Sequence, residues 1–161
     1  MNTQKAIVRG TMTAMMAGMV AIGPAAFADD DDHGKVVISS PLAPPAIGPY
    51  SQGIRVGRTV YVSGEVGADK TGKIIGPSVG DQTDEALENI GHILSAAGLT
   101  LDDVVSTTVY LTNVSDFKEM NAHYAKFFAV APPARATIQV AALPKPGALL
   151  EISAIAVDTH D

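Results

Sequence analysis

Hydrophobic and polar residues alternate with a period of two over six short stretches of the chain, a pattern typical of β-strands with one covered face. We expect strands at residues 35–38, 50–57, 59–66, 103–112, 134–141 and 149–157. Gly57 and Arg58 separate two of these stretches and predict a tight hairpin turn. Residues 41–49 contain four prolines and predict an extended loop.

Two other stretches repeat apolar residues at steps of three and four, which predicts amphipathic helices at residues 81–97 and 116–128. Gly98 follows the first helix and predicts its C-terminal cap. Asp116 and Glu119 have the spacing of a capping pair at the start of the second.

The predicted order is therefore β-β-β-α-β-α-β-β, an α+β domain. Two helices can cover only one face of such a sheet. The last strand, Leu149–Val157, is apolar at nearly every position, as in strands that are covered on both faces. We expect another subunit to cover the second face.

Composition narrows the class of protein. Hydrophobic residues make up 47% of the 161 residues, charged residues make up 17%, and the formal net charge is -6. This balance argues for a folded domain and against a nucleic-acid partner. There is no cysteine, so disulfides, thiolate metal sites and cysteine nucleophiles are excluded.

The first 28 residues have the order of a secretory signal peptide: basic Lys5 and Arg9, an apolar stretch, then a small-x-small site ending at Ala28. A buried N-terminal helix and an uncleaved anchor are the alternatives. Residues 29–34, DDDDHG, predict a solvated linker, and residues 35–161 the domain itself. Cleavage would leave nine Lys and Arg against 17 Asp and Glu in a periplasmic or secreted protein.

Several polar residues lie within apolar stretches or next to predicted turns. Arg135 begins one terminal strand and Glu151 lies within the other. An arginine can clamp a carboxylate through two hydrogen bonds, and a glutamate in apolar surroundings can hold or activate a water. A structural salt bridge between the two is an equal alternative. Tyr50, Ser63 and Asn121 stand out in the same way.

Five segments, taken together and in this order, resemble the reactive intermediate deaminase (Rid, also YjgF) family. They are PPAIGPYSQG (44–53), VSGEVG (62–67), AAGLTLDDVVSTTVYLTNVSDFKEMNAHYAKFF (96–128), PPARATIQVAALP (132–144) and LLEISAIAV (149–157). The resemblance covers nearly the whole chain from Lys35 onward.

The resemblance implies a chorismate-mutase-like fold, a mixed sheet of about six strands with two helices on one face, assembled as a homotrimer with ligand clefts between subunits. It implies hydrolysis of reactive 2-imino or enamine acids to 2-oxo acids and ammonia, without a metal or organic cofactor. Arg135 would hold the substrate carboxylate and Glu151 the water. Five further positions would line the cleft: Tyr50, Ser63, Gly64, Asn121 and Thr137.

Thr137 stands where relatives often have cysteine, and Ser153 stands where acidic residues are frequent. Most relatives also lack a signal peptide. Two alternatives to the deaminase remain open: a non-catalytic carboxylate-binding or chaperone-like trimer, and an endoribonuclease. The negative charge argues against the last of these.

Overall fold

A computed structural model describes residues 34–160, and the predicted signal peptide and most of the predicted linker lie outside the described residues. Six strands form one sheet: β1 (Val36–Ile38), β2 (Gly53–Val56), β3 (Thr59–Val66), β4 (Val104–Leu111), β5 (Ala134–Gln139) and β6 (Leu150–Val157). The two α-helices are α1 (Val79–Ala96) and α2 (Phe117–Phe127). The predicted order of elements is confirmed.

The strand order across the sheet is β1-β2-β3-β6-β4-β5. β6 lies in the middle and pairs antiparallel with both β3 and β4, whereas β5 pairs parallel with β4 at the edge. β6 is therefore not a neighbour of β5, although the two strands are consecutive in the chain. A parallel pair needs a crossover connection, and α2 supplies it between β4 and β5.

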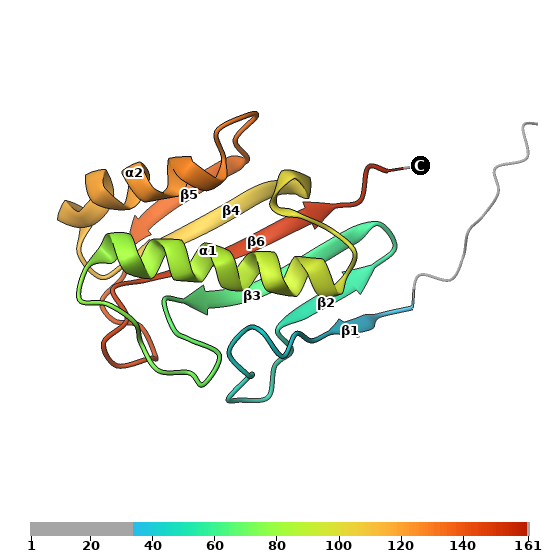
Figure 1. Ribbon diagram of the computed structural model, residues 1–161, viewed down its shortest axis with the longest axis horizontal. Helices are drawn as coiled ribbons and strands as arrows, with labels where there is room; N and C mark the ends of the chain where they lie inside the picture. Colours follow the sequence, from blue (N-terminus) through green and yellow to red (C-terminus); the bar gives the residue numbers. More distant parts are fainter. Residues whose placement is uncertain (1–33, 161) are drawn as a thin grey trace, which may run out of the picture. The chain divides into compact units, whose positions relative to one another are not determined.

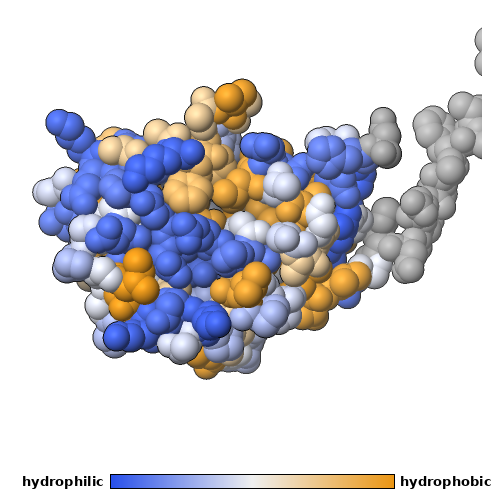
Figure 2. Space-filling model, in the orientation of Figure 1, coloured by the Kyte–Doolittle hydropathy of each residue, from blue (hydrophilic) through white to orange (hydrophobic). Residues whose placement is uncertain are grey.

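Both helices pack on the same face of the sheet, as Figure 1 shows, so the predicted layer arrangement is confirmed. The core lies between α1 and the central strands, where Leu87, Ile90, Leu94 and Ile152 are fully buried. The outer face of α1 is hydrophilic in Figure 2. On the opposite face of the sheet, Tyr61, Val105 and other apolar side chains stay exposed.

Local signals explain most helix ends. α1 begins at Val79, two residues before the predicted start, because the Ser78 side chain accepts a hydrogen bond from the Asp81 amide at 3.0 Å. Gly98, with a positive φ of 76°, ends the helix as predicted. The predicted capping pair of α2 is wrong. Asp116 makes no capping hydrogen bond, and Glu119 instead accepts one from the Gly80 amide of α1 at 3.2 Å.

Across residues 34–160, none of the helices combines the length and the apolar character that crossing a membrane requires.

Candidate functional site

A cavity of about 360 Å³ lies at the end of β3. The proline-rich loop, the last residues of β3, the segment before β6 and the start of β6 form its walls. Four of the seven residues predicted for a site line it: Tyr50, Ser63, Gly64 and Glu151. The volume is in the range of small-molecule sites.

A β-bulge shapes the wall of this cavity. The pairing of β3 with β6 shifts register between Val62 and Glu65, so Ser63 and Gly64 leave the regular ladder. The Ser63 hydroxyl donates a hydrogen bond to the Ser51 carbonyl at 2.6 Å. The Ser63 amide donates to the Gln52 carbonyl at 2.9 Å. Ser63 therefore fixes the loop that carries Tyr50 against the strand.

Gly64 leaves room for the side chain of Glu151. A Cβ atom at residue 64 would overlap the Glu151 carboxyl group. Glycine is thus required here by a close approach, which is one of the uses of glycine at a bulge. The carboxyl of Glu151 lies directly over the bulge, in contact with the cavity.

If Glu151 acts on a substrate in this cavity, Gly64→Ala is expected to lower turnover by about 10²-fold while the protein stays folded, because the new methyl group displaces the flexible Glu151 side chain from its position. Steady-state kinetics with a melting curve tests this. Gly72→Ala is a poor control because Gly72 has a positive φ of 82°. Gly91→Ala is suitable, because a Cβ atom at this helical position makes only an ordinary contact with Leu101, at 3.8 Å. Unchanged turnover in Gly64→Ala would contradict the placement of Glu151.

Burial raises the pKa of Glu151 above its ordinary value. Glu151 pairs in register with Val66 of β3 and with Tyr110 of β4, so its side chain points to the face of the sheet that carries no helix. A carboxylate whose pKa is raised is a better proton acceptor near neutral pH than an exposed one.

A second carboxyl group lines the same cavity and was missed by the sequence analysis. Glu65 follows the bulge and is only 6% exposed. Burial, followed by the like charge of Glu151, raises the pKa of Glu65 to about 8. Regular alternation from the buried Val60 and Val62 would turn residue 65 away from the core, and the bulge turns it inward, so periodicity alone gave no signal for Glu65.

The other three predicted residues gather at the sheet edge, around β5 and α2. Arg135 donates a hydrogen bond from Nη2 to Oδ1 of Asn121 at 2.6 Å. Its guanidinium lies 4.5 Å from the ring centroid of Tyr124 and 5.9 Å from that of Phe117. Arg135 itself remains exposed, so one side of the guanidinium is held by α2 and other donors are free to bind an anion.

Tyr124 supports this arrangement from below. Its hydroxyl and the Thr107 hydroxyl are hydrogen-bonded at 2.7 Å, which fixes the ring beneath the guanidinium. Burial raises the pKa of Tyr124, and it therefore remains neutral over the physiological range.

Thr137 lies on the same face of β5 as Arg135, as the alternation predicted. Its hydroxyl oxygen is buried and makes no hydrogen bond to any residue that the structure describes. A buried hydroxyl without a hydrogen-bond partner lowers the stability of the folded chain, so Thr137 is an unfavourable residue here within a single chain.

The two groups of residues are far apart within one chain. β4 lies between β5 and β6, and neighbouring strands are about 5 Å apart, so roughly 10 Å separates the two strands. The register also turns Arg135 toward α2 and Glu151 toward the uncovered face. A salt bridge between Arg135 and Glu151, the structural alternative, is absent from the described residues.

Asn121 of α2 and Arg135 of β5 meet in the same chain. Their hydrogen bond within one chain shows that they belong to one group. The chain thus carries two separate sets of groups: a sheet edge with Arg135 and Asn121, and a cavity with Tyr50, Ser63 and Glu151.

Comparison with known proteins gives the family. A profile of the endoribonuclease L-PSP family matches residues 40–158. The chain belongs to this family. The resemblance that the five segments carried is confirmed, because solved structures similar to this chain include a protein of the Rid family from Yersinia pestis and the YjgF protein of E. coli.

Similar members of the L-PSP family carry different names. The human 2-iminobutanoate/2-iminopropanoate deaminase is 48% identical over 122 residues, which cover 75% of this chain and 88% of the human protein. A RutC family protein of Saccharolobus solfataricus is 46% identical, with 76% and 97% covered. The crystal structure of E. coli TdcF with bound serine superimposes with a TM-score of 0.73 at 41% identity, covering 77% of this chain and 99% of that one.

Proposed function

We propose that the protein is a deaminase that hydrolyses reactive 2-imino or enamine acids, such as 2-iminopropanoate and 2-iminobutanoate, to 2-oxo acids and ammonia. The observation that carries the proposal is the Glu151 carboxyl, held over the Gly64 bulge in a cavity of small-molecule size. Relatives named for this activity, about 48% identical to this chain, support it.

Each group has a part in the reaction. Arg135 binds the substrate carboxylate, with Asn121 holding the guanidinium in place. Glu151 accepts a hydrogen bond from a water and directs it at the imine carbon. This carbon is already electrophilic, so positioning supplies much of the rate. Tyr50, Ser63 and Gly64 form the cavity wall, and Thr137 lies beside the clamp.

The separation of the two groups supports an assembly in which one subunit supplies Arg135 and its neighbour supplies Glu151. A cyclic homotrimer provides three such contacts with the same geometry. The uncovered sheet face, with exposed Tyr61, Val105 and Ile155, is the surface that this assembly would bury.

The test generates 2-iminopropanoate from alanine with an amino-acid oxidase and traps it with semicarbazide. Wild type is expected to suppress semicarbazone formation. Arg135→Ala is expected to need about 10²-fold more protein for the same suppression, because it loses charge-assisted hydrogen bonds to the carboxylate. Lys118→Ala, which removes an exposed cation of α2, is the control and should match wild type. Equal suppression by Arg135→Ala and wild type would rule out the clamp.

TdcF with bound serine favours a second candidate function, a trimer that binds small carboxylates without turnover, because serine also carries a carboxylate. Calorimetric binding of 2-oxobutanoate by a protein that leaves semicarbazone formation unchanged would support it. Endoribonuclease activity, which the family name suggests, is disfavoured by the net charge of -6, and an RNA digestion assay decides it.

We also propose export to the periplasm or the exterior. The basic, apolar and small-x-small order of residues 1–28 supports it. Mass spectrometry of the exported protein would give an N-terminus at Asp29 if cleavage follows Ala28.

A further inference from the structure

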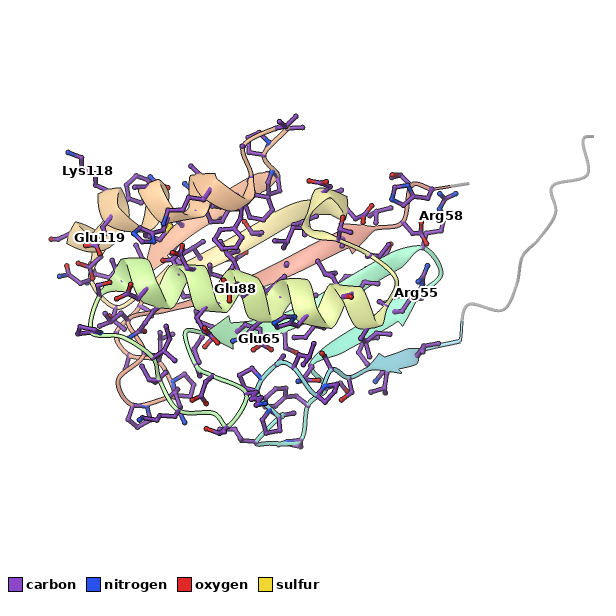
Figure 3. The ribbon with its side chains drawn as sticks, viewed as in Figure 1. Arg55, Arg58, Glu65, Glu88, Lys118 and Glu119 are labelled. Carbon is purple, nitrogen blue, oxygen red and sulfur yellow. The ribbon has the colours of Figure 1, made fainter. Side chains whose placement is uncertain are left out.

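The cavity holds two carboxyl groups, and Glu65 has no part in the reaction as described so far. Glu65 lies at the end of β3, and Figure 3 shows it there beneath α1. It pairs in register with Ile152, on the covered face of the sheet, whereas Glu151 is on the other face. Both nevertheless border the cavity, because the cavity lies where β3 ends.

The carboxyl of Glu65 has no hydrogen-bond partner to satisfy it among residues 34–160. Only burial and the charge of Glu151 act on its pKa, and both raise it, to about 8. Glu151 titrates first, since its charge raises the pKa of Glu65, whereas burial alone raises its own. Of the two carboxyls, Glu65 is therefore the one that holds its proton more strongly.

Few other ionisable side chains lie near the Glu65 carboxyl. The other titratable side chains that line the cavity are Tyr50 and Lys145. The buried polar side chains by which α1 faces the sheet are Gln82, Thr83 and Asn89, none of which is ionisable. Asn89 and Gln82 are occupied with backbone groups, at 2.8 Å from the Ala68 carbonyl and 3.1 Å from the Gly147 carbonyl.

We propose that Glu65 is the acid of this site, which protonates the nitrogen of the bound imine while Glu151 accepts the proton of the attacking water. The proposal rests on the deaminase function above and adds a residue and a proton path to it. It gives the cavity one carboxyl group that donates a proton and a second that accepts one, the usual division for paired acid and base catalysis.

The protons balance over the two halves of the reaction. In the first, the water oxygen bonds to the imine carbon and its proton goes to Glu151, while the proton of Glu65 goes to nitrogen as the C=N π bond breaks. A neutral carbinolamine results. In the second, Glu151 returns its proton to nitrogen, the C–N bond breaks, and ammonia leaves. The carbinolamine hydroxyl proton goes to Glu65 as the C=O bond forms, which restores both carboxyls.

Glu65→Gln tests this, because glutamine has the same shape and cannot give up a proton. We expect a kcat about 10²-fold lower with KM within a few-fold of wild type, as for loss of a general acid. The wild-type rate, corrected for uncatalysed hydrolysis at each pH, should fall as pH rises through about 8, and the variant should lack this limb. Glu88→Gln, an exposed glutamate of α1 labelled in Figure 3, is the matched control.

The outcomes separate the two proposals. An active wild type with an unchanged kcat and alkaline limb in Glu65→Gln overturns the role of Glu65 alone. A wild type without turnover overturns the deaminase function and the role of Glu65 with it. Should Glu65→Gln fail to fold, carbon-13 spectra of the wild-type carboxyl groups decide. A signal that titrates near pH 8 and moves when 2-oxobutanoate binds supports the proposal, and the absence of any such signal overturns it.

Discussion

Glu65→Gln is expected to be more stable than wild type at pH 8, by an amount on the order of 4 kcal/mol, since each unit of pKa shift corresponds to about 1.4 kcal/mol. The ordinary pKa of the glutamate is 4.5, and burial with the charge of Glu151 raises it to about 8 in the folded protein. The folded state therefore binds a proton that the unfolded state has released.

The sign of the pH dependence follows from this proton. Below pH 4.5 both states are protonated and Glu65 costs no stability. Between pH 4.5 and about 8 the unfolded state is ionised while the folded state is not, so the free energy of unfolding falls as pH rises. Above about pH 8 the full loss is present. Glutamine does not titrate and removes the whole effect.

Urea unfolding measures the free energy of unfolding of wild type, Glu65→Gln and Glu88→Gln at a series of pH values from 4 to 9. All measurements use one protein concentration, because the stability of an oligomer depends on protein concentration. The Glu65→Gln curve should diverge from wild type as pH rises, and the Glu88→Gln curve should follow wild type. Parallel wild-type and Glu65→Gln curves would show that Glu65 is not held protonated by the fold.

Glu151→Gln is expected to lower kcat by about 10³-fold with little change in the affinity for 2-oxobutanoate, as general-base loss typically costs 10²- to 10⁴-fold. Glutamine keeps the shape over Gly64 but no longer accepts a proton from water. Because the proposed function assigns the affinity for the carboxylate to Arg135, the two variants should change different kinetic constants. Arg135→Ala raises KM, whereas Glu151→Gln acts on kcat.

Single-turnover assays with calorimetric binding separate these effects. Glu88→Gln, on the exposed face of α1 and outside the cavity, controls for the loss of a carboxylate on the surface. A Glu151→Gln protein that retains wild-type kcat would assign the water to another group.

Periodicity alone was sufficient to predict the six strands, the two α-helices and the single covered face of the sheet, but not the short 3-10 helices Leu101–Asp103 and Val114–Asp116. It could not predict which strands are neighbours. β6 is last in the chain yet lies at the centre of the sheet, because two antiparallel partners pair with it over long separations. Local patterns carry no information on such pairings, so the sequence could not show that β4 separates the strands of Arg135 and Glu151.

For the site, too, the sequence identified residues but not their contacts. Motif resemblance found Tyr50, Ser63, Gly64 and Glu151, which the fold brings to one cavity. It did not indicate that Asn121 binds Arg135 within one chain, since that contact depends on how α2 crosses β5. Glu65 was missed because the bulge at Ser63 and Gly64, which changes which way the next side chain points, is visible only in the pairing with β6.

Mixed oligomers of Arg135→Ala and Glu151→Gln test most directly whether the imine is hydrolysed in a cleft shared by two chains. Each variant alone is expected to be almost inactive in the semicarbazide assay. Unfolded and refolded together, they should regain about one quarter of wild-type activity, the fraction of clefts that combine an intact Arg135 with an intact Glu151 from its neighbour in a random cyclic trimer. A mixture no more active than the separately refolded variants would contradict a shared site.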